Sequence, residues 1–171
     1  MYPPIRINGQ VYGGGNRLSA EEAARYSMEW DRLRFSPEEL ALRMERIAFL
    51  ESADTEGCPM EEGEGVTCRA GSTSFWLTWD GRMLPCGMMT EPEAYPLEVG
   101  FDAAWEQIRA ATAMIRTPAQ CRSCSKKEIC GVCASVCYGE TGHFDEVPEY
   151  MCERADHLVR MAREIRKECQ T

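Results

Sequence analysis

The sequence has little of what a membrane protein or a nucleic-acid-binding protein needs. No apolar run approaches the length of a membrane-spanning helix, and the first residues, Met-Tyr-Pro-Pro-Ile-Arg, lack the apolar centre of a signal peptide. The formal net charge is -9, whereas phosphate backbones and anionic lipid surfaces attract clusters of Lys and Arg. We therefore expect a cytoplasmic protein with no nucleic-acid or membrane partner.

Histidine is also scarce, whereas cysteine is abundant. His143 and His157 are the only histidines, too few to indicate mixed Cys–His zinc ligation, and we interpret each as structural or solvent-facing. The chain has 10 cysteines, which would form disulfides in a secreted protein. Because the secretion signal is missing, these clustered thiols indicate metal binding or redox chemistry in a reducing compartment.

Capping signals and apolar periodicity predict four helices. Ser19 and Glu22 form a capping box before a helix over about residues 20–33, and Ser36-Pro37 begins a second helix that runs to about residue 51. Helical spacing predicts a third helix over 101–115 and a fourth from Pro148-Glu149 to about residue 167. In the first helix we expect one face to pack in the core, made of Ala23, Tyr26, Trp30 and Leu33.

A β-hairpin is predicted between the second and third helices. Its strands, 74–79 and 83–86, flank Asp80-Gly81, a dipeptide that favours a tight turn. Cys68 precedes the first strand and Cys86 ends the second, so the two thiols could share one metal centre.

Two other segments are predicted to be loops. Residues 1–18 contain Gly13-Gly14-Gly15, which does not match a phosphate-binding motif, so we expect a flexible loop that leads to the first helix. Residues 52–66 mix acidic residues with glycines and form an acidic linker in this interpretation. Cys58 lies within the linker and is a candidate additional ligand.

The spacing of the remaining thiols is the strongest chemical signal. Two Cys-x2-Cys pairs are separated by five residues, whereas structural zinc sites usually separate such pairs by a dozen or more. Several close thiols completed by a distant one are more typical of iron–sulfur ligation. One zinc site would leave about half of the cysteines unexplained. The stretch contains Cys121, Cys124, Cys130, Cys133, Cys137 and Cys152.

This pattern resembles the SPASM domain, the C-terminal auxiliary-cluster module of radical S-adenosylmethionine enzymes. The resemblance covers about residues 58–155 and rests on Cys68-x12-Gly81-x4-Cys86, then Cys121-x2-Cys124-x5-Cys130 and a final Cys152. It implies two auxiliary [4Fe-4S] clusters. Family precedent assigns one cluster to Cys121, Cys124, Cys130 and Cys152, and the other to Cys68 and Cys86, with Cys58 as the third ligand and either Cys133 or Cys137 as the fourth. Cys169 is interpreted as a free thiol.

The chain also departs from radical S-adenosylmethionine enzymes. It lacks the Cys-x3-Cys-x2-Cys motif that leaves one iron open to S-adenosylmethionine, and it lacks βα repeats for a barrel. We therefore expect a fragment that is inactive alone, with the radical S-adenosylmethionine barrel and a peptide or protein substrate as partners. S-adenosylmethionine would bind only in that barrel.

The expected fold is a small, Cys-rich α+β domain with one β-hairpin, helices on either side and long cluster-binding loops. Residues 1–57 would form an N-terminal helical linker, 58–155 the SPASM-like module and 156–171 a C-terminal helix. Four aromatic residues are candidates for a shell that shields the clusters from oxygen: Trp76, Trp79, Phe144 and Tyr150.

The resemblance implies roles in electron transfer and substrate docking during maturation of a peptide or protein. The alternative is a zinc-binding structural or interaction module with no redox role, in which zinc takes the cluster sites. A self-standing ferredoxin ranks last, because the chain lacks the compact Cys-x2-Cys-x2-Cys-x3-Cys-Pro run.

Overall fold

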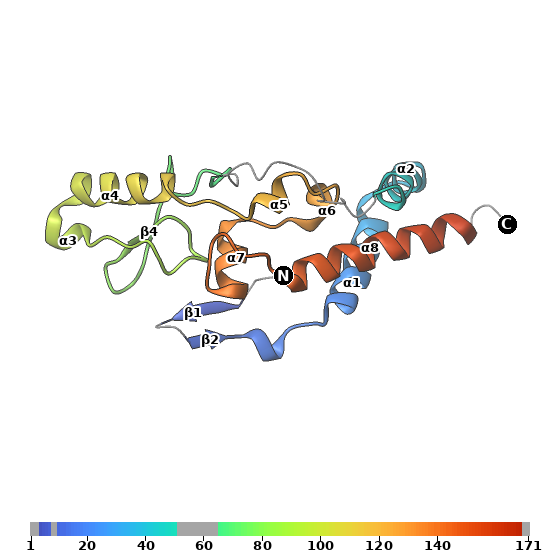
Figure 1. Ribbon diagram of the computed structural model, residues 1–171, viewed down its shortest axis with the longest axis horizontal. Helices are drawn as coiled ribbons and strands as arrows, with labels where there is room; N and C mark the ends of the chain where they lie inside the picture. Colours follow the sequence, from blue (N-terminus) through green and yellow to red (C-terminus); the bar gives the residue numbers. More distant parts are fainter. Residues whose placement is uncertain (1–3, 8–9, 51–64, 169–171) are drawn as a thin grey trace.

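The computed structural model describes residues 4–7, 10–50 and 65–168, and it has a mixed α+β architecture as predicted (Figure 1). No helix in this part of the chain is both long enough and apolar enough to cross a membrane. The described elements are β1 (Ile5–Ile7), β2 (Gln10–Tyr12), the 3-10 turn η1 (Gly14–Asn16), α1 (Ala20–Arg34), α2 (Pro37–Ala48), β3 (Trp76–Leu77), β4 (Met83–Leu84), α3 (Pro96–Val99), α4 (Phe101–Ala113), α5 (Ala119–Arg122), α6 (Lys127–Cys130), α7 (Ala134–Thr141) and α8 (Glu149–Glu168).

The first two helices begin at the predicted caps. The Ser19 hydroxyl accepts the Glu22 backbone N–H at 3.2 Å, and the Glu22 carboxylate accepts the Ser19 backbone N–H at 2.9 Å. Ser36 and Glu39 form the same reciprocal pair at the start of α2. Each box satisfies backbone donors that the first helical turn leaves without partners. α2 ends at Ala48 rather than near residue 51.

The prediction of a buried face on α1 is wrong for its large side chains. Tyr26, Trp30 and Leu33 are 56%, 66% and 83% exposed. The helix instead buries small or flexible side chains, and these allow a neighbouring helix to approach closely. They are Ala20, Ala23, Ala24 and Met28.

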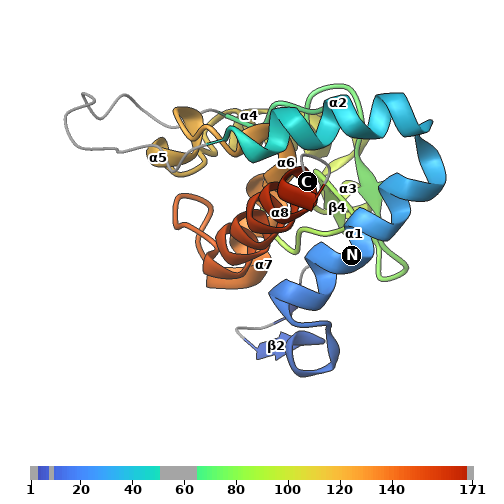
Figure 2. The same cartoon turned by 90° about the vertical axis from the view of Figure 1, so that its right-hand side faces the viewer.

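Helices α1, α2 and α8 form one helical core. α8 packs against both of the other helices, which cross it in Figure 2. The prediction of α8 itself is confirmed, with Leu158 buried. Burying a Leu, Ile or Met side chain contributes about 1.5–3 kcal/mol. The buried residues of this core are Ala24, Met28, Met44, Ile47, Ala48, Leu158, Val159 and Ala162.

The predicted β-hairpin is present, with shorter strands than expected. Trp76 pairs with Leu84 and Leu77 with Met83, and Gly81 in the connection has a positive φ of 86° that suits glycine. Met83 and Leu84 are buried, because this side of the hairpin packs on α4. Met83, Ala94, Ala104 and Ile108 form a second core.

Gly71 lies in close contact with α4, in the loop that precedes β3. Its φ is +66°, and a Cβ at this position would lie 2.2 Å from Oγ1 of Thr112. Thr112 is buried, so its side chain has little room to move. The absence of a side chain at Gly71 therefore allows this loop to pack against the helix.

We expect Gly71→Ala to lower the free energy of unfolding by about 1–3 kcal/mol through overpacking and backbone strain. Denaturant unfolding of the metal-free protein would measure the change. Gly15→Ala is the matched control, because an added Cβ there meets nothing within 4 Å. Equal unfolding midpoints for the two variants would contradict the close contact.

A second antiparallel pair, β1–β2, replaces the loop that was predicted before α1. Ile5 pairs with Tyr12 and Ile7 with Gln10. The pair is attached to α7 by Arg6, whose guanidinium donates to the backbone carbonyls of Tyr138 and Glu140, each at 3.1 Å. The fold therefore has two small β-ribbons where one was expected.

Candidate metal centre

The thiols between residues 121 and 152 come from short helices and the turns that join them. Pro118 precedes α5, and Gly131, with a φ of 68°, ends α6 in the left-handed conformation. These two breaks fold the segment back on itself rather than extending one helix. Cys121 lies on α5, Cys124 between α5 and α6, Cys130 at the end of α6, Cys133 at the N-cap of α7, Cys137 within α7 and Cys152 in the first turn of α8.

Four of these thiols form a mutually interacting set, which we call the first thiol group: Cys121, Cys124, Cys130 and Cys152. Burial, and then the neighbouring Cys152, Cys130 and Cys124, raises the pKa of Cys121 to about 11. Burial and then Cys124 also raise the pKa of Cys152. Like charges affect each other's pKa in this way only at short range. The Cys130 thiol also donates to the Met151 carbonyl at 3.7 Å, so the first turn of α8, which carries Cys152, lies beside the end of α6.

A small cavity brings together thiols from the two Cys-bearing regions. Its volume is about 90 Å³, and Cys68, Cys86, Cys121 and Cys133 all line it. Cys68 precedes β3 and Cys86 follows β4, so the hairpin places both thiols beside the α5–α7 segment. We call Cys68, Cys86 and Cys133 the second thiol group. Cys58 lies outside the described residues.

Cys133 and Cys137 have different environments. Cys133 lines the cavity, and its sulfur lies 3.1 Å from the Ser135 hydroxyl. Cys137 is fully buried and is not among the described residues that line the cavity. Burial, followed by the neighbouring Cys121, Cys133 and Cys130, raises the pKa of Cys137 to about 12. Cys133 is therefore the better placed of the two alternatives for a centre shared with Cys68 and Cys86.

Basic side chains surround the thiols, and the sequence prediction missed them. Arg122 and Lys127 line the cavity, while the charges of Lys126 and Arg154 lower the pKa of Cys152 and Cys130, respectively, against the larger effect of burial. Positive charge stabilises the thiolate form that binds metal. The sequence did contain a signal, since Lys126-Lys127 lies between the two Cys-x2-Cys pairs.

Apolar side chains cover part of the cavity. Met89, Ile115 and Ala134 are buried together, with Cys86 and Phe144 packed against them. Phe144 also stacks on Tyr138, with the ring centroids 4.8 Å apart. Phe144 is therefore in a position to shield this region.

The other three aromatic candidates for shielding differ in position. Trp76 lies over Gly87, where an added Cβ would meet its ring at 3.2 Å, so it covers the segment beside Cys86. Trp79 is 98% exposed, so the expectation that it belongs to a shielding shell is wrong. The Tyr150 hydroxyl donates to the Leu18 carbonyl and thus links α8 to the segment before α1.

The donor set suits a soft metal or an iron–sulfur cluster. Both groups offer cysteine sulfur alone, which favours zinc, copper(I) or iron–sulfur clusters over magnesium or calcium. Within residues 4–7, 10–50 and 65–168, no three His, Cys, Asp or Glu side chains are already arranged around a single metal-ion position. The thiols would have to reorient around any ion or cluster that they bind.

Metal binding to the thiol groups is expected to release protons. Burial and the neighbouring thiols raise the pKa of Cys121 to about 11, so this thiol is neutral at pH 7, and a thiol must lose its proton to become a ligand. Because fewer protons remain to be displaced at higher pH, the apparent affinity for zinc should rise with pH. Calorimetric titration in buffers of different ionisation enthalpy would count the protons released. A binding heat that is the same in all buffers would contradict this expectation.

Comparisons with models of known protein families, with curated proteins and with solved structures each found no match. The resemblance to the SPASM domain therefore rests on the cysteine spacing of this chain.

Proposed function

We propose that the chain is an auxiliary [4Fe-4S] cluster-binding module of a radical S-adenosylmethionine maturase that acts on a peptide or protein. One observation carries the proposal: thiols distant in sequence converge in two groups. Cys152 joins Cys121, Cys124 and Cys130, and Cys68 and Cys86 share a cavity with Cys121 and Cys133. A zinc ion needs only four ligands, so a single zinc site would use one thiol group and leave the other group unexplained.

Each thiol group would hold one cluster. The first thiol group supplies four ligands, the usual number for a [4Fe-4S] cluster. The second group supplies three, and Cys58 is the candidate fourth ligand. When bound, such clusters carry single electrons. The role of this chain is to fix their positions, to supply nearby positive charge through Lys126, Lys127 and Arg154, and to cover them with apolar side chains.

The partners in this proposal are the radical S-adenosylmethionine barrel, which would bind S-adenosylmethionine, and the peptide or protein substrate. The clusters would serve electron transfer and substrate docking, and a reducing cytoplasm would keep the thiols available for ligation. The alternative is a zinc-binding structural or interaction module, since thiolates also suit zinc.

Anaerobic reconstitution with iron and sulfide tests the proposal. About eight irons and eight sulfides per chain, with a cubane EPR signal after dithionite reduction, would support two clusters. About four irons would support the first thiol group alone and would show that the second group does not complete a site. Tight zinc binding with no EPR-active iron would overturn the redox function and favour the zinc module.

A further inference from the structure

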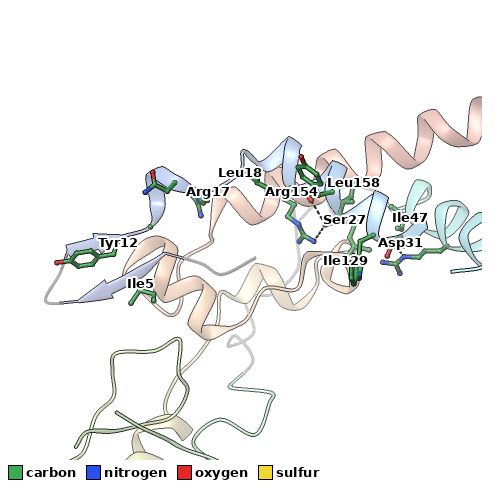
Figure 3. Close-up of a pocket in the computed structure, with 16 residues that line it drawn as sticks. Ile5, Tyr12, Arg17, Leu18, Ser27, Asp31, Ile47, Ile129, Arg154 and Leu158 are labelled. Atoms are coloured by element: carbon green, nitrogen blue, oxygen red, sulfur yellow. Dashed lines mark hydrogen bonds and ion pairs between the residues drawn. The ribbon is translucent and has the colours of Figure 1, made fainter. Parts of the chain in front are cut away.

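A large groove lies on the α1 side of the thiol-bearing segment. Its volume is about 880 Å³, and it runs between the β1–β2 pair and helices α1, α2, α6 and α8 (Figure 3). None of the described residues that line it is a cysteine. Its size falls within the range of sites that bind small molecules or short peptide segments.

The lining of the groove is basic, although the protein is acidic. Its charged lining residues are Arg17, Arg43, Arg154 and Asp31, in a chain whose net charge is -9. Asp31 is paired with Arg43 at 2.7 Å, and Arg17 forms an ion pair with Glu140. Among the charged residues that line the groove, Arg154 is therefore the one whose charge is not paired with an opposite charge of the described residues.

Arg154 has neutral partners. Its guanidinium donates to the Cys130 carbonyl at 3.1 Å and to the Ser27 hydroxyl at 3.2 Å. Over the described parts of the chain, it has no ion pair with a carboxylate. A guanidinium has five N–H donors in a planar fork, and this geometry matches a carboxylate. A half-buried arginine with neutral partners is therefore suited to bind an acidic side chain from a ligand.

Exposed aromatic rings line the same groove. Tyr26 and Trp30 lie on α1, 56% and 66% exposed, and Tyr12 on β2 is 51% exposed. All three line the groove, which also contains the apolar side chains of Ile47 and Leu158. Exposed tryptophan and tyrosine together with arginine are the residues that most often dominate binding at protein interfaces.

The length of the groove favours a peptide over a small carboxylate. Its lining along α1 extends from Ala23 to Asp31, which is about 12 Å at 1.5 Å per helical residue. The β1–β2 pair extends the lining further, through Ile5 and Tyr12. An extended peptide covers about 3.3–3.6 Å per residue, so roughly four residues would occupy the stretch along α1 alone.

We propose that the groove binds an extended peptide segment that carries alternating acidic and apolar side chains. Arg154 binds a carboxylate of the segment, and Tyr26 and Trp30 pack against its apolar side chains. This site goes beyond the proposed cluster function. Arg154 contacts the backbone of Cys130, a proposed cluster ligand, whereas Tyr26 and Trp30 are positioned by the packing of α1 against α8, so peptide binding is measured both with and without iron.

Fluorescence anisotropy with a labelled hexapeptide, Glu-Leu-Glu-Phe-Glu-Leu, tests the proposal on the full chain, both as purified and after iron loading. The matched peptide has Gln in place of each Glu. We expect the Glu peptide to bind at least about tenfold more tightly, because its carboxylates accept charge-assisted hydrogen bonds from Arg154 and the Gln amides do not. We also expect the difference to shrink as salt is added.

Three variants locate the site. Arg154→Gln should reduce the affinity for the Glu peptide to that for the Gln peptide. Trp30→Ser should weaken both peptides about tenfold through lost aromatic contact, and because Trp30 is 66% exposed, it does not depend on the Arg154–Cys130 contact. Trp79→Ser, at the other ribbon, is the control and should bind like the unaltered chain. Equal binding of the two peptides, or unchanged binding by Trp30→Ser, would overturn the proposal whether or not the protein takes up iron.

Discussion

Replacing Cys152 with alanine is expected to remove about four irons per chain from the reconstituted protein, the content of one [4Fe-4S] cluster. Cys152 is the thiol that α8 contributes to the first thiol group, and the Cys130 thiol donates to the carbonyl of Met151, next to Cys152, at 3.7 Å. Iron and sulfide analysis after anaerobic reconstitution measures the loss, and the EPR signal that remains reports on the second group.

The control for this variant is Cys169→Ala, which also removes one thiol but one that we interpret as free. Far-ultraviolet circular dichroism of the metal-free Cys152→Ala protein should show the helical content of the unaltered chain, because alanine is compatible with a helix and the other residues of the 20-residue helix α8 are unchanged. Full iron content in a folded Cys152→Ala protein would show that the first thiol group is not a cluster site.

The second prediction concerns the iron content of two variants, Cys133→Ala and Cys137→Ala. Cys133→Ala is expected to lose the cluster of the second thiol group, again about four irons, because Cys133 shares a cavity with Cys68 and Cys86. Cys137→Ala should keep its iron. Its effect should be on stability, a loss of about 1–2 kcal/mol for removing one buried sulfur from α7.

Iron analysis and denaturant unfolding of the two variants, measured side by side, separate these roles. Cys68→Ala provides the reference for loss of the second cluster, and Cys133→Ala should match it in iron content and in residual EPR signal. If Cys137→Ala lost iron while Cys133→Ala kept it, the assignment would be reversed and the cavity would not be the ligand site.

The helices could be predicted because their start signals are local. Ser19 with Glu22 and Ser36 with Glu39 act within one turn, so the printed sequence contains the whole interaction. The buried face of α1 could not be predicted in the same way. Which side chains it buries depends on α8, more than a hundred residues later, and contacts such as Arg154 to Ser27 across 127 positions are not visible in local periodicity.

The β1–β2 pair was missed although part of its signal is present. Asn8-Gly9 separates Ile5–Ile7 from Gln10–Tyr12, and Asn-Gly is a strong hairpin signal. The strands are only three residues long and largely exposed, too short for the alternation that marks a half-buried strand to be recognised in the sequence. Their anchor is Arg6, which reaches carbonyls 132 and 134 positions away.

The candidate site followed from the sequence only in part. The resemblance to the SPASM domain implied that Cys152 joins the earlier thiols, but it left Cys133 and Cys137 as equal alternatives. They differ in the structure because Cys133 caps α7 at the cavity while Cys137, one turn later, faces the interior. Tertiary packing decides which of two thiols one turn apart on a helix faces the cavity, and the cysteine spacing does not determine this.

Helix α8 carries a candidate metal ligand at one end and packs in the helical core further along. Cys152 lies in its first turn, and Ala162, about 15 Å further along the axis at 1.5 Å per residue, is fully buried against α1 and α2. Because an α-helix is stiff over this distance, the proposed ligation at Cys152 would restrain the whole helix and not the first turn alone. Loss of metal would free the N-terminal end of α8. The rate at which a protease cleaves α1 and α2 would then report, at a distance, whether the thiols hold a metal.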